Sequence, residues 1–297
     1  MAGLKLEGVI SAMVTPFTKG GEYVDFDKVG PFAERMVKMG AKGLFPCGTT
    51  GEGLLLSTEE RKTVLEEVVQ AVGKKATVIA HTGCMDTATV IELTRHAQKV
   101  GAHGAAIVSP FYYYYDEASL WQFYSSIAKA VDGFPILVYN IPSCARNVLT
   151  PEFVIRLAEI DNIVGIKDSS GSMGGLTQML AKAPKGFNVV NGVDEYGFQA
   201  ILAGCPAVVS GLSNVVCDIY AAVYNHLKKG DLKKAWKEQI RLELASRVFE
   251  YGRKAAVFKE GSRLRGFDAG YVRPPMRELT AAEKKKLAAD MQTLGVL

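Results

Sequence analysis

The chain has 297 residues, of which 48% are hydrophobic and 22% charged, and its formal net charge is +4. This composition is typical of a globular protein with a large core, and it excludes a disordered chain, a collagen-like repeat and a small disulfide scaffold. The charge surplus is too small for a nucleic-acid-binding surface, and the sequence has no run of 18 apolar residues that would span a membrane. We therefore expect neither a nucleic acid nor a membrane as a partner.

The first residues and the cysteines and histidines bear on compartment and metal binding. Residues 1–11 contain neither a long apolar region nor an A-x-A cleavage site, so we expect no secretory signal and a cytoplasmic protein. The five cysteines include no C-x-x-C pair, and we expect them to be reduced thiols. The four histidines lack H-x-x-x-H and H-E-x-x-H spacing, so we expect no metal site.

Short apolar runs alternate with longer segments of helical periodicity. The runs that we predict to be strands span residues 8–14, 43–47, 76–80, 105–108, 135–139, 163–166, 187–190 and 207–210. They are apolar on both faces, as strands buried in a parallel sheet must be. Helical patterns such as 58–72 and 86–100 lie between them, and the first follows a capping sequence that begins at Ser57.

This alternation predicts a TIM (β/α)8 barrel, because eight βα units in about 220 residues match that fold. A doubly wound open sheet is the competing architecture, but the G-x-G-x-x-G turn that would favour it is absent. After about residue 225 the strand signal stops, and residues 232–251, 255–264 and 281–294 are expected to be helices. We predict a barrel domain of residues 1–225 and a C-terminal helical extension of residues 226–297.

In such a barrel the reacting groups come from the carboxyl ends of the strands. Lys167 directly follows the apolar run 163–166. An ammonium group is costly to bury there, and a lysine that gives up its proton is a nucleophile that forms Schiff bases with carbonyls. The alternative is a lysine that extends out of the barrel mouth and pairs with Asp168.

Two further strand ends carry groups that suit the same chemistry. Tyr139 could relay protons to and from a Schiff-base intermediate, or it could be a barrel tyrosine with a hydrogen-bonded hydroxyl. The turn Gly48-Thr49-Thr50-Gly51 offers two hydroxyls and closely spaced N–H groups that can hold a carboxylate. Glycine-rich turns of this kind also occur in unrelated barrels.

The tyrosine run and a pair of acidic residues each allow two interpretations. The tyrosine run 112–115 could form an oligomer contact or a substrate wall, and at least one of its members should be exposed. Asp194 and Glu195 could bind hydroxyl groups or cap the next helix.

Three motifs in this order resemble those of the dihydrodipicolinate synthase / N-acetylneuraminate lyase superfamily of pyruvate-dependent class I aldolases. They are Gly48-Thr49-Thr50-Gly51-Glu52, Tyr139-Asn140-Ile141-Pro142 and Gly165-Ile166-Lys167. The resemblance runs from Gly8 to about Pro275 and continues into the helical tail. It implies an enzyme that uses pyruvate and an aldehyde, needs no metal or organic cofactor, and forms a homo-oligomer built as a dimer of dimers.

The resemblance also implies roles for single residues. Lys167 matches the Schiff-base lysine, and Tyr139 matches the tyrosine that shuttles protons. Thr49 matches the threonine that links this tyrosine to a second one. Tyr112 matches that second tyrosine, which in many members enters the neighbouring subunit's site. Thr50 matches the clamp on the pyruvate carboxylate.

Binding of the keto acid and of the aldehyde involves further positions. Gly48 belongs to the clamp turn, and Val209 matches a strand-eight position whose carbonyl lies near the bound keto acid. The stretch from Gly192 to Asp194 and Glu195 is similar to one that binds sugar hydroxyls in sialic acid lyases. Ser169 could add a hydroxyl contact.

Departures from the family pattern concern the substrate. Lysine-biosynthetic members usually carry an arginine where this chain has Cys144, and the sequence leaves open whether Arg146 replaces it. Met85 and Thr89 stand where the lysine-feedback pocket has an amide and a carboxylate, so feedback by lysine is not expected. Gly211 stands where sialic acid lyases tend to have a hydroxyl.

The sequence thus predicts a lyase acting on a 2-keto-3-deoxy sugar acid or a sialic-acid-like substrate. The alternative is 4-hydroxy-tetrahydrodipicolinate synthase, which condenses pyruvate with aspartate semialdehyde, or a related Schiff-base dehydratase. A non-catalytic barrel is disfavoured because Lys167 and Tyr139 are both present.

Overall fold

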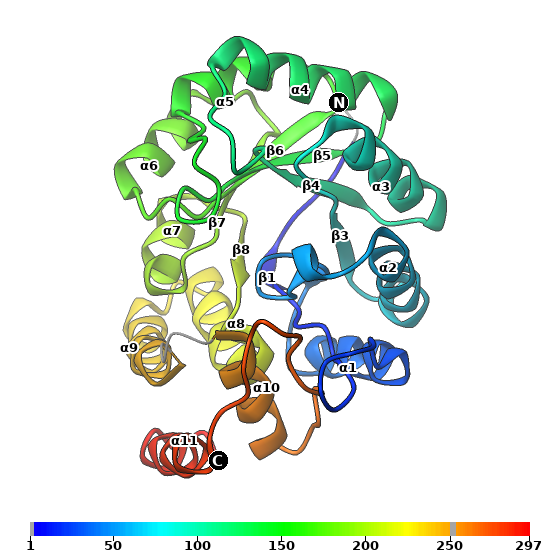
Figure 1. Ribbon diagram of the computed structural model, residues 1–297. Coiled ribbons are helices and arrows are strands. Elements are labelled where there is room, and N and C mark those ends of the chain that lie inside the picture. The colour runs from blue at the N-terminus through cyan, green and yellow to red at the C-terminus, as the bar shows by residue number, and fades with distance from the viewer. Residues whose placement is uncertain (1–2, 250–253) are drawn as a thin grey trace.

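Eight parallel strands, hydrogen-bonded to one another in sequence order, close into a barrel in the computed structural model (Figure 1). The structure describes residues 3–249 and 254–297. The strands are β1 (Gly8–Ser11), β2 (Gly43–Leu44), β3 (Thr77–His81), β4 (Gly104–Val108), β5 (Ile136–Asn140), β6 (Ile163–Asp168), β7 (Asn188–Asn191) and β8 (Ala207–Ser210). The predicted TIM barrel is confirmed.

Helices alternate with the strands and surround the sheet (Figure 1). They are α1 (Phe26–Lys38), α2 (Thr58–Val72), α3 (Thr87–Val100), α4 (Glu117–Ala130), α5 (Pro151–Leu157), α6 (Met173–Lys182), α7 (Gly197–Ala203) and α8 (Ser213–Lys228). Two short 3₁₀ helices, η1 (Gly53–Leu55) and η2 (Asp194–Tyr196), follow β2 and β7. The capping sequence is confirmed, because the Ser57 hydroxyl accepts from the Glu60 N–H while Glu60 accepts from the Ser57 N–H.

The C-terminal extension continues beyond the barrel as α9 (Leu232–Phe249), α10 (Lys254–Leu264) and α11 (Ala281–Thr293), as expected. The predicted end of the first of these helices, at residue 251, lies outside the described residues. The predicted boundary at residue 225 falls inside α8, which packs against both α9 and α10. Arg265, which follows α10, donates to both carboxylate oxygens of Asp218 on α8 at 2.8 and 2.9 Å.

Alternation along the strands separates two apolar layers. Ile107, Val138 and Ile166 belong to the large core between the sheet and the helices. Val108 and Tyr139 belong to a second core that fills the barrel. Successive side chains of a strand point to opposite faces. The residue after Ile166 therefore faces the barrel interior.

Only β4 and β8 end at the predicted residue: β3, β5 and β7 each end one residue later, and β1 ends at Ser11 instead of residue 14. The differences in β2 and β6 shape the mouth of the barrel. β2 stops at Leu44, because Pro46 has no N–H for a ladder and Cys47 takes a φ of 58°. β6 continues through Lys167 to Asp168, where Lys167 pairs in register with Tyr139 on β5 and Val190 on β7. The lysine is thus held inside the sheet rather than in the loop after it.

None of the helices in the described ranges combines the length and apolar character that crossing a membrane would require.

Substitution of Gly165 tests how tightly β6 packs against β7. A Cβ at this position would lie 2.5 Å from the Asn188 carbonyl oxygen and 2.8 Å from the Asn188 Cβ. Gly165→Ala should therefore lower the free energy of unfolding by about 1–3 kcal/mol, measured by denaturant titration. Gly174→Ala in α6 is the matched control, because no atom lies within 4 Å of its added Cβ. Equal losses of stability in the two variants would contradict the packing described.

Candidate active site

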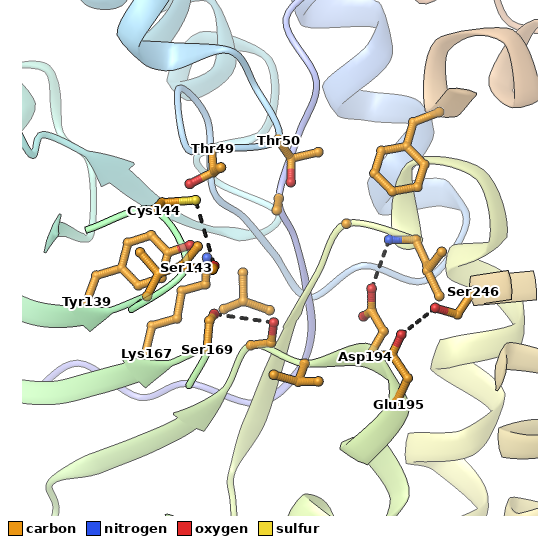
Figure 2. Close-up of a pocket in the computed structure, with 18 of the residues that line it drawn as sticks. Thr49, Thr50, Tyr139, Ser143, Cys144, Lys167, Ser169, Asp194, Glu195 and Ser246 are labelled. Atoms are coloured by element: carbon orange, nitrogen blue, oxygen red, sulfur yellow. Dashed lines mark hydrogen bonds between the residues drawn. The ribbon is translucent and has the colours of Figure 1, made fainter. Parts of the chain in front are cut away.

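A pocket of about 410 Å³ opens at the carboxyl ends of the strands. Figure 2 shows Tyr139 and Lys167 on one side of it and Asp194 and Glu195 on the other. Its lining includes nearly all the residues predicted for the site, together with Ala12, Ile141, Ser143, Cys144, Val193, Gly211, Leu212, Ser246, Phe249 and Phe258. The predicted residues that line it are Thr49, Thr50, Tyr139, Lys167, Ser169, Gly192, Asp194, Glu195 and Val209.

Lys167 is buried, with only 5% of its surface exposed, yet it lines the pocket. Its Nζ lies 3.8 Å from the centre of the Tyr139 ring and 4.4 Å from that of Phe45. Within the described part of the chain it forms no ion pair. Aromatic faces, rather than a carboxylate, therefore hold the amine at a place that a carbonyl compound can reach.

Asp168 does not pair with the lysine beside it. Its carboxylate accepts from the Asn140 side chain at 2.9 Å and from the Ser170 hydroxyl at 2.9 Å. Burial raises the pKa of this carboxyl group, and these hydrogen bonds act against the shift. The alternative in which Lys167 leaves the barrel mouth and pairs with Asp168 is wrong, because neighbours in a strand point to opposite faces.

Tyr139 faces the same interior as Lys167 and is 2% exposed. Its ring stands edge-on to Phe45 and to His81, with centroids 5.9 and 6.0 Å apart. Beside it, Asn140 Oδ1 accepts from the Leu149 N–H at 3.1 Å and fixes the loop after β5. The register of β5 and β6 thus brings a phenol and an amine together in one pocket.

The turn after β2 presents Thr49 and Thr50 to the pocket, whereas Gly48 is not part of the lining. A Cβ on Gly48 would lie 2.5 Å from the ring of Phe45. A Cβ on Gly53 would collide with the Cys47 carbonyl oxygen. Glycine at these two places therefore lets the turn fold tightly on itself, and Gly48 contributes to the site by allowing this backbone path.

Hydroxyls and carboxylates line the rest of the pocket: Ser169 lies beside Lys167, whereas Asp194 and Glu195 lie across from it (Figure 2). The Ser169 hydroxyl donates to the Gly192 carbonyl at 3.3 Å. Asp194 Oδ2 accepts from the Leu212 N–H at 3.2 Å, and Glu195 accepts from the Ser246 hydroxyl. Both acids lie in the first turn of η2, which leads directly into α7, although the N-cap residues of these two helices form no side-chain cap. Leu212, which donates to Asp194, is the N-cap residue of α8.

Tyr112 lies outside the pocket of its own chain. It is 69% exposed with a φ of 78°, and Tyr113 and Tyr114 are exposed as well. The expectation of an exposed tyrosine in this run is confirmed. The entry of Tyr112 into a neighbouring subunit's site stays a prediction.

Sequence reasoning missed the part of the pocket that comes from the C-terminal extension. Ser246 and Phe249 on α9 and Phe258 on α10 line it. No motif marks these residues, and they lie far along the chain from the strand ends that they face. A Cβ on Gly211 would lie 3.2 Å from the Phe258 ring, so this phenylalanine occupies the space that a hydroxyl side chain at position 211 would need.

Neither of the two positions compared with the family's arginine brings a positive charge to the pocket lining. Cys144 lines the pocket, whereas Arg146 is exposed and is not part of the described lining. Among the described residues of that lining, Lys167 alone carries a cationic side chain. The five cysteines are all free thiols.

A buried histidine lies beneath the tyrosine. His81 Nδ1 lies 3.0 Å from the Cys47 carbonyl, which can only accept, so this nitrogen carries the proton. The guanidinium of Arg61 donates to the carbonyls of His81 and Gly83 at 2.7 and 3.2 Å. Burial, and after it the charges of Arg61 and Lys167, hold the pKa of His81 well below its usual value.

A family profile, known proteins and solved structures that resemble this chain all indicate the same family. The profile of the dihydrodipicolinate synthetase family matches residues 5–294. An uncharacterized DapA-like lyase of Halobacterium salinarum is 36% identical over 294 residues, which make up 99% of this chain and 96% of that protein. A 4-hydroxy-tetrahydrodipicolinate synthase of Syntrophus aciditrophicus is 36% identical over 292 residues, or 98% of this chain and 99% of that protein.

Solved structures that resemble this chain come from the same family. One is the crystal structure of YagE from E. coli K12, a prophage protein of the dihydrodipicolinic acid synthase family, in complex with pyruvate. It superposes with a TM-score of 0.94 at 28% identity, and the match covers 98% of this chain and 99% of that chain.

The buried His81 predicts a pH dependence of stability. In the unfolded chain this histidine takes up a proton near its ordinary pKa of 6.5, whereas in the folded protein its lowered pKa keeps it neutral. The unfolded state therefore binds more protons below that pH, and the unfolding free energy falls by up to about 1.4 kcal/mol per pH unit as the solution is acidified. His81→Gln should flatten this part of the pH–stability curve in denaturant titrations. Parallel curves for the variant and the wild type would contradict the lowered pKa.

Proposed function

The chain belongs to the dihydrodipicolinate synthetase family of pyruvate-dependent class I aldolases, and we propose that it forms or cleaves a carbon–carbon bond between pyruvate and a hydroxylated aldehyde. The proposed substrate is a 2-keto-3-deoxy sugar acid or a sialic-acid-like compound. The observation that supports this proposal is the pocket itself, in which Lys167 and Tyr139 face a wall of hydroxyls and carboxylates with no cationic side chain among its described residues.

In the cleavage direction Lys167 Nζ attacks the ketone carbon of the substrate. Loss of water from the carbinolamine gives an iminium ion, which draws electrons from the C3–C4 bond. Tyr139 donates its phenolic proton to the hydroxyl group that leaves the carbinolamine, and the resulting phenolate takes the proton of the C4 hydroxyl as the C3–C4 bond breaks and the aldehyde leaves. The remaining enamine gains a proton at C3, and water then releases pyruvate and the free lysine. Because the iminium is the electron sink, this sequence uses no metal or organic cofactor.

The keto-acid end of the substrate lies against the turn after β2. Thr50, with its N–H and hydroxyl, holds the carboxylate, and the backbone path of Gly48 gives that turn its shape. Thr49 connects Tyr139 to Tyr112, which a neighbouring subunit supplies. The carbonyl of Val209 lies on the opposite side of the keto acid.

The aldehyde end extends from Ser169 and Gly192, which lie next to Lys167, toward Asp194 and Glu195 on the far side of the pocket. Carboxylate oxygens are strong acceptors for the hydroxyl groups of a polyol. An aldehyde that carries its own carboxylate would meet like charges there. The neutral side chain of Cys144 offers such an anion no compensating charge. These features favour a sugar-derived aldehyde.

A second candidate is 4-hydroxy-tetrahydrodipicolinate synthase, which uses aspartate semialdehyde. The observation that favours it is the name of the Syntrophus aciditrophicus relative, which matches nearly the whole chain. The same lysine and tyrosine would serve that reaction.

We further propose a homo-oligomer, built as a dimer of dimers, in which the tyrosine run meets a second subunit. An apolar cavity of about 260 Å³ adjoins the pocket and shares Thr49, Ile141 and Cys144 with it. The exposed side chains of Leu54 and Met276 line this cavity. A second subunit would cover such a surface. The cytoplasmic location and the domain boundary at residue 225 stay predictions from the sequence.

A substrate panel tests the proposed function. Pyruvate release from 2-keto-3-deoxy sugar acids and sialic acid is compared with condensation of pyruvate and aspartate semialdehyde, each followed as kcat/KM. We expect at least about a tenfold preference for a sugar acid, the worth of one lost hydrogen bond or repulsive contact. Cys144→Arg should shift the preference toward the semialdehyde, whereas Arg146→Ala should leave it unchanged. A wild-type preference for the semialdehyde would establish the second candidate instead.

A further inference from the structure

Glu52 and Lys259 form an ion pair in the interior of the protein, between the turn that carries Thr49 and Thr50 and helix α10. The side chains are 0% and 1% exposed, and Lys259 Nζ lies 2.6 Å from Glu52 Oε1. The two residues are 207 positions apart in the chain. Neither of them lines the pocket that holds Lys167.

Each member of the pair has a second fixed contact. Glu52 Oε2 accepts from the Arg273 N–H at 2.9 Å. Lys259 Nζ donates to the Tyr271 carbonyl at 2.5 Å and lies 4.7 Å from the centre of the Phe17 ring. Both of these contacts are to the backbone of residues 271–273, so the carboxylate and the ammonium are tied to each other and to the same segment after α10.

The turn before Glu52 leaves little freedom for motion between the pair and the two threonines. Glu52 has a φ of 57°, a left-handed conformation that a side chain other than glycine rarely adopts. Its N–H donates to the Thr49 carbonyl at 3.2 Å, and the Thr15 hydroxyl donates to the Gly51 carbonyl at 2.6 Å. A displacement of the Glu52 side chain is thus passed directly to Thr49 and Thr50.

Helix α10 also reaches the pocket next to this pair. Phe258, the residue before Lys259, lines the pocket. The Cβ position of Gly211 lies 3.2 Å from the Phe258 ring and 3.4 Å from Thr50 Oγ1. The ring and the Thr50 hydroxyl therefore flank the same small volume, so α10 and the turn must keep a fixed spacing.

We propose that Glu52 and Lys259 are positioning residues that set where Thr49 and Thr50 stand in the pocket, so that the C-terminal extension fixes the carboxylate clamp. The inference rests on the proposed role of Thr50 in holding pyruvate. A buried ion pair adds little stability compared with apolar residues of the same volume, whereas its fixed geometry defines the spacing of the two segments that it joins. Positioning of this kind affects binding, because a small misplacement of a binding group weakens a substrate contact strongly.

Burial disfavours the charged form of both side chains, so each stays charged only because the opposite charge lies beside it. It raises the pKa of Glu52 and lowers the pKa of Lys259, while their mutual attraction opposes both shifts. Removal of either charge therefore favours the neutral form of the remaining group and releases the turn from α10.

The test measures the pyruvate concentration that gives half-maximal trapping of Lys167 by borohydride, followed by peptide mass spectrometry. Glu52→Asp keeps the charge but shortens the side chain, so the fold should tolerate it while the turn shifts. We expect the half-saturating concentration to rise about tenfold, with the maximal trapped fraction unchanged. Lys259→Met, which changes the pair from the α10 side, should give a rise of the same size.

A double-mutant cycle separates positioning from general destabilisation. Thr50→Val should raise the half-saturating concentration, and adding Glu52→Asp to it should raise that concentration no further, because both changes remove the same contact. Asp218→Asn is the matched control, since it breaks the Arg265 ion pair that also anchors the extension but does not touch the turn. It should leave the half-saturating concentration at the wild-type value.

The outcomes distinguish the two proposals. Absence of trapping in the wild type, or an unchanged value in Thr50→Val, would overturn the proposed function and this inference with it. The expected rise of the half-saturating concentration in Thr50→Val, combined with a further, multiplying rise in the double variant, would overturn the positioning role alone. A folded Glu52→Asp or Lys259→Met protein with wild-type half-saturation would do the same.

Discussion

The register between β5 and β6 is the constraint on which the site depends. It sets Tyr139 directly beside Lys167, and alternation along both strands turns the two side chains into the barrel. A slip of either strand by one residue would send its own side chain, the phenol or the amine, to the helix-facing layer and separate the two. The Asn140–Asp168 hydrogen bond joins the next pair of residues on the outer face of the same two strands and holds this register. The proposed reactive pair is therefore placed by the sheet rather than by a loop.

Aromatic side chains around Lys167 and Tyr139 fix the two groups in the positions that the strand register gives them. Lys167 lies against two ring faces instead of a carboxylate, and the ring of Tyr139 is braced by Phe45 and His81. The fixed proton on His81 Nδ1 and its lowered pKa leave a neutral ring beneath the tyrosine. Helices α9 and α10, which follow the barrel in the chain, add hydroxyl and aromatic side chains to the lining of the pocket. The extension thus contributes to the candidate active site.

Sequence alone predicted the barrel and the strand-end residues, because short apolar runs that alternate with helical periodicity, and polar groups that follow those runs, are local signals. It placed Lys167 after its strand, whereas pairing on both sides extends β6 past it. It could not find Phe258, because helix α10 reaches the pocket through tertiary packing that leaves no mark in local spacing. It likewise could not show that Asp194 accepts a hydrogen bond from Leu212 at the start of α8, since that bond depends on how β7 and β8 sit together.

The central claim is that the amine of Lys167 forms an imine with pyruvate inside this pocket. A crystal soaked in pyruvate tests it most directly. We predict continuous electron density from Lys167 Nζ to the C2 atom of the bound compound, with the carboxylate against Thr50. An unbonded amine directed into solvent, with pyruvate absent or bound elsewhere, would contradict the account.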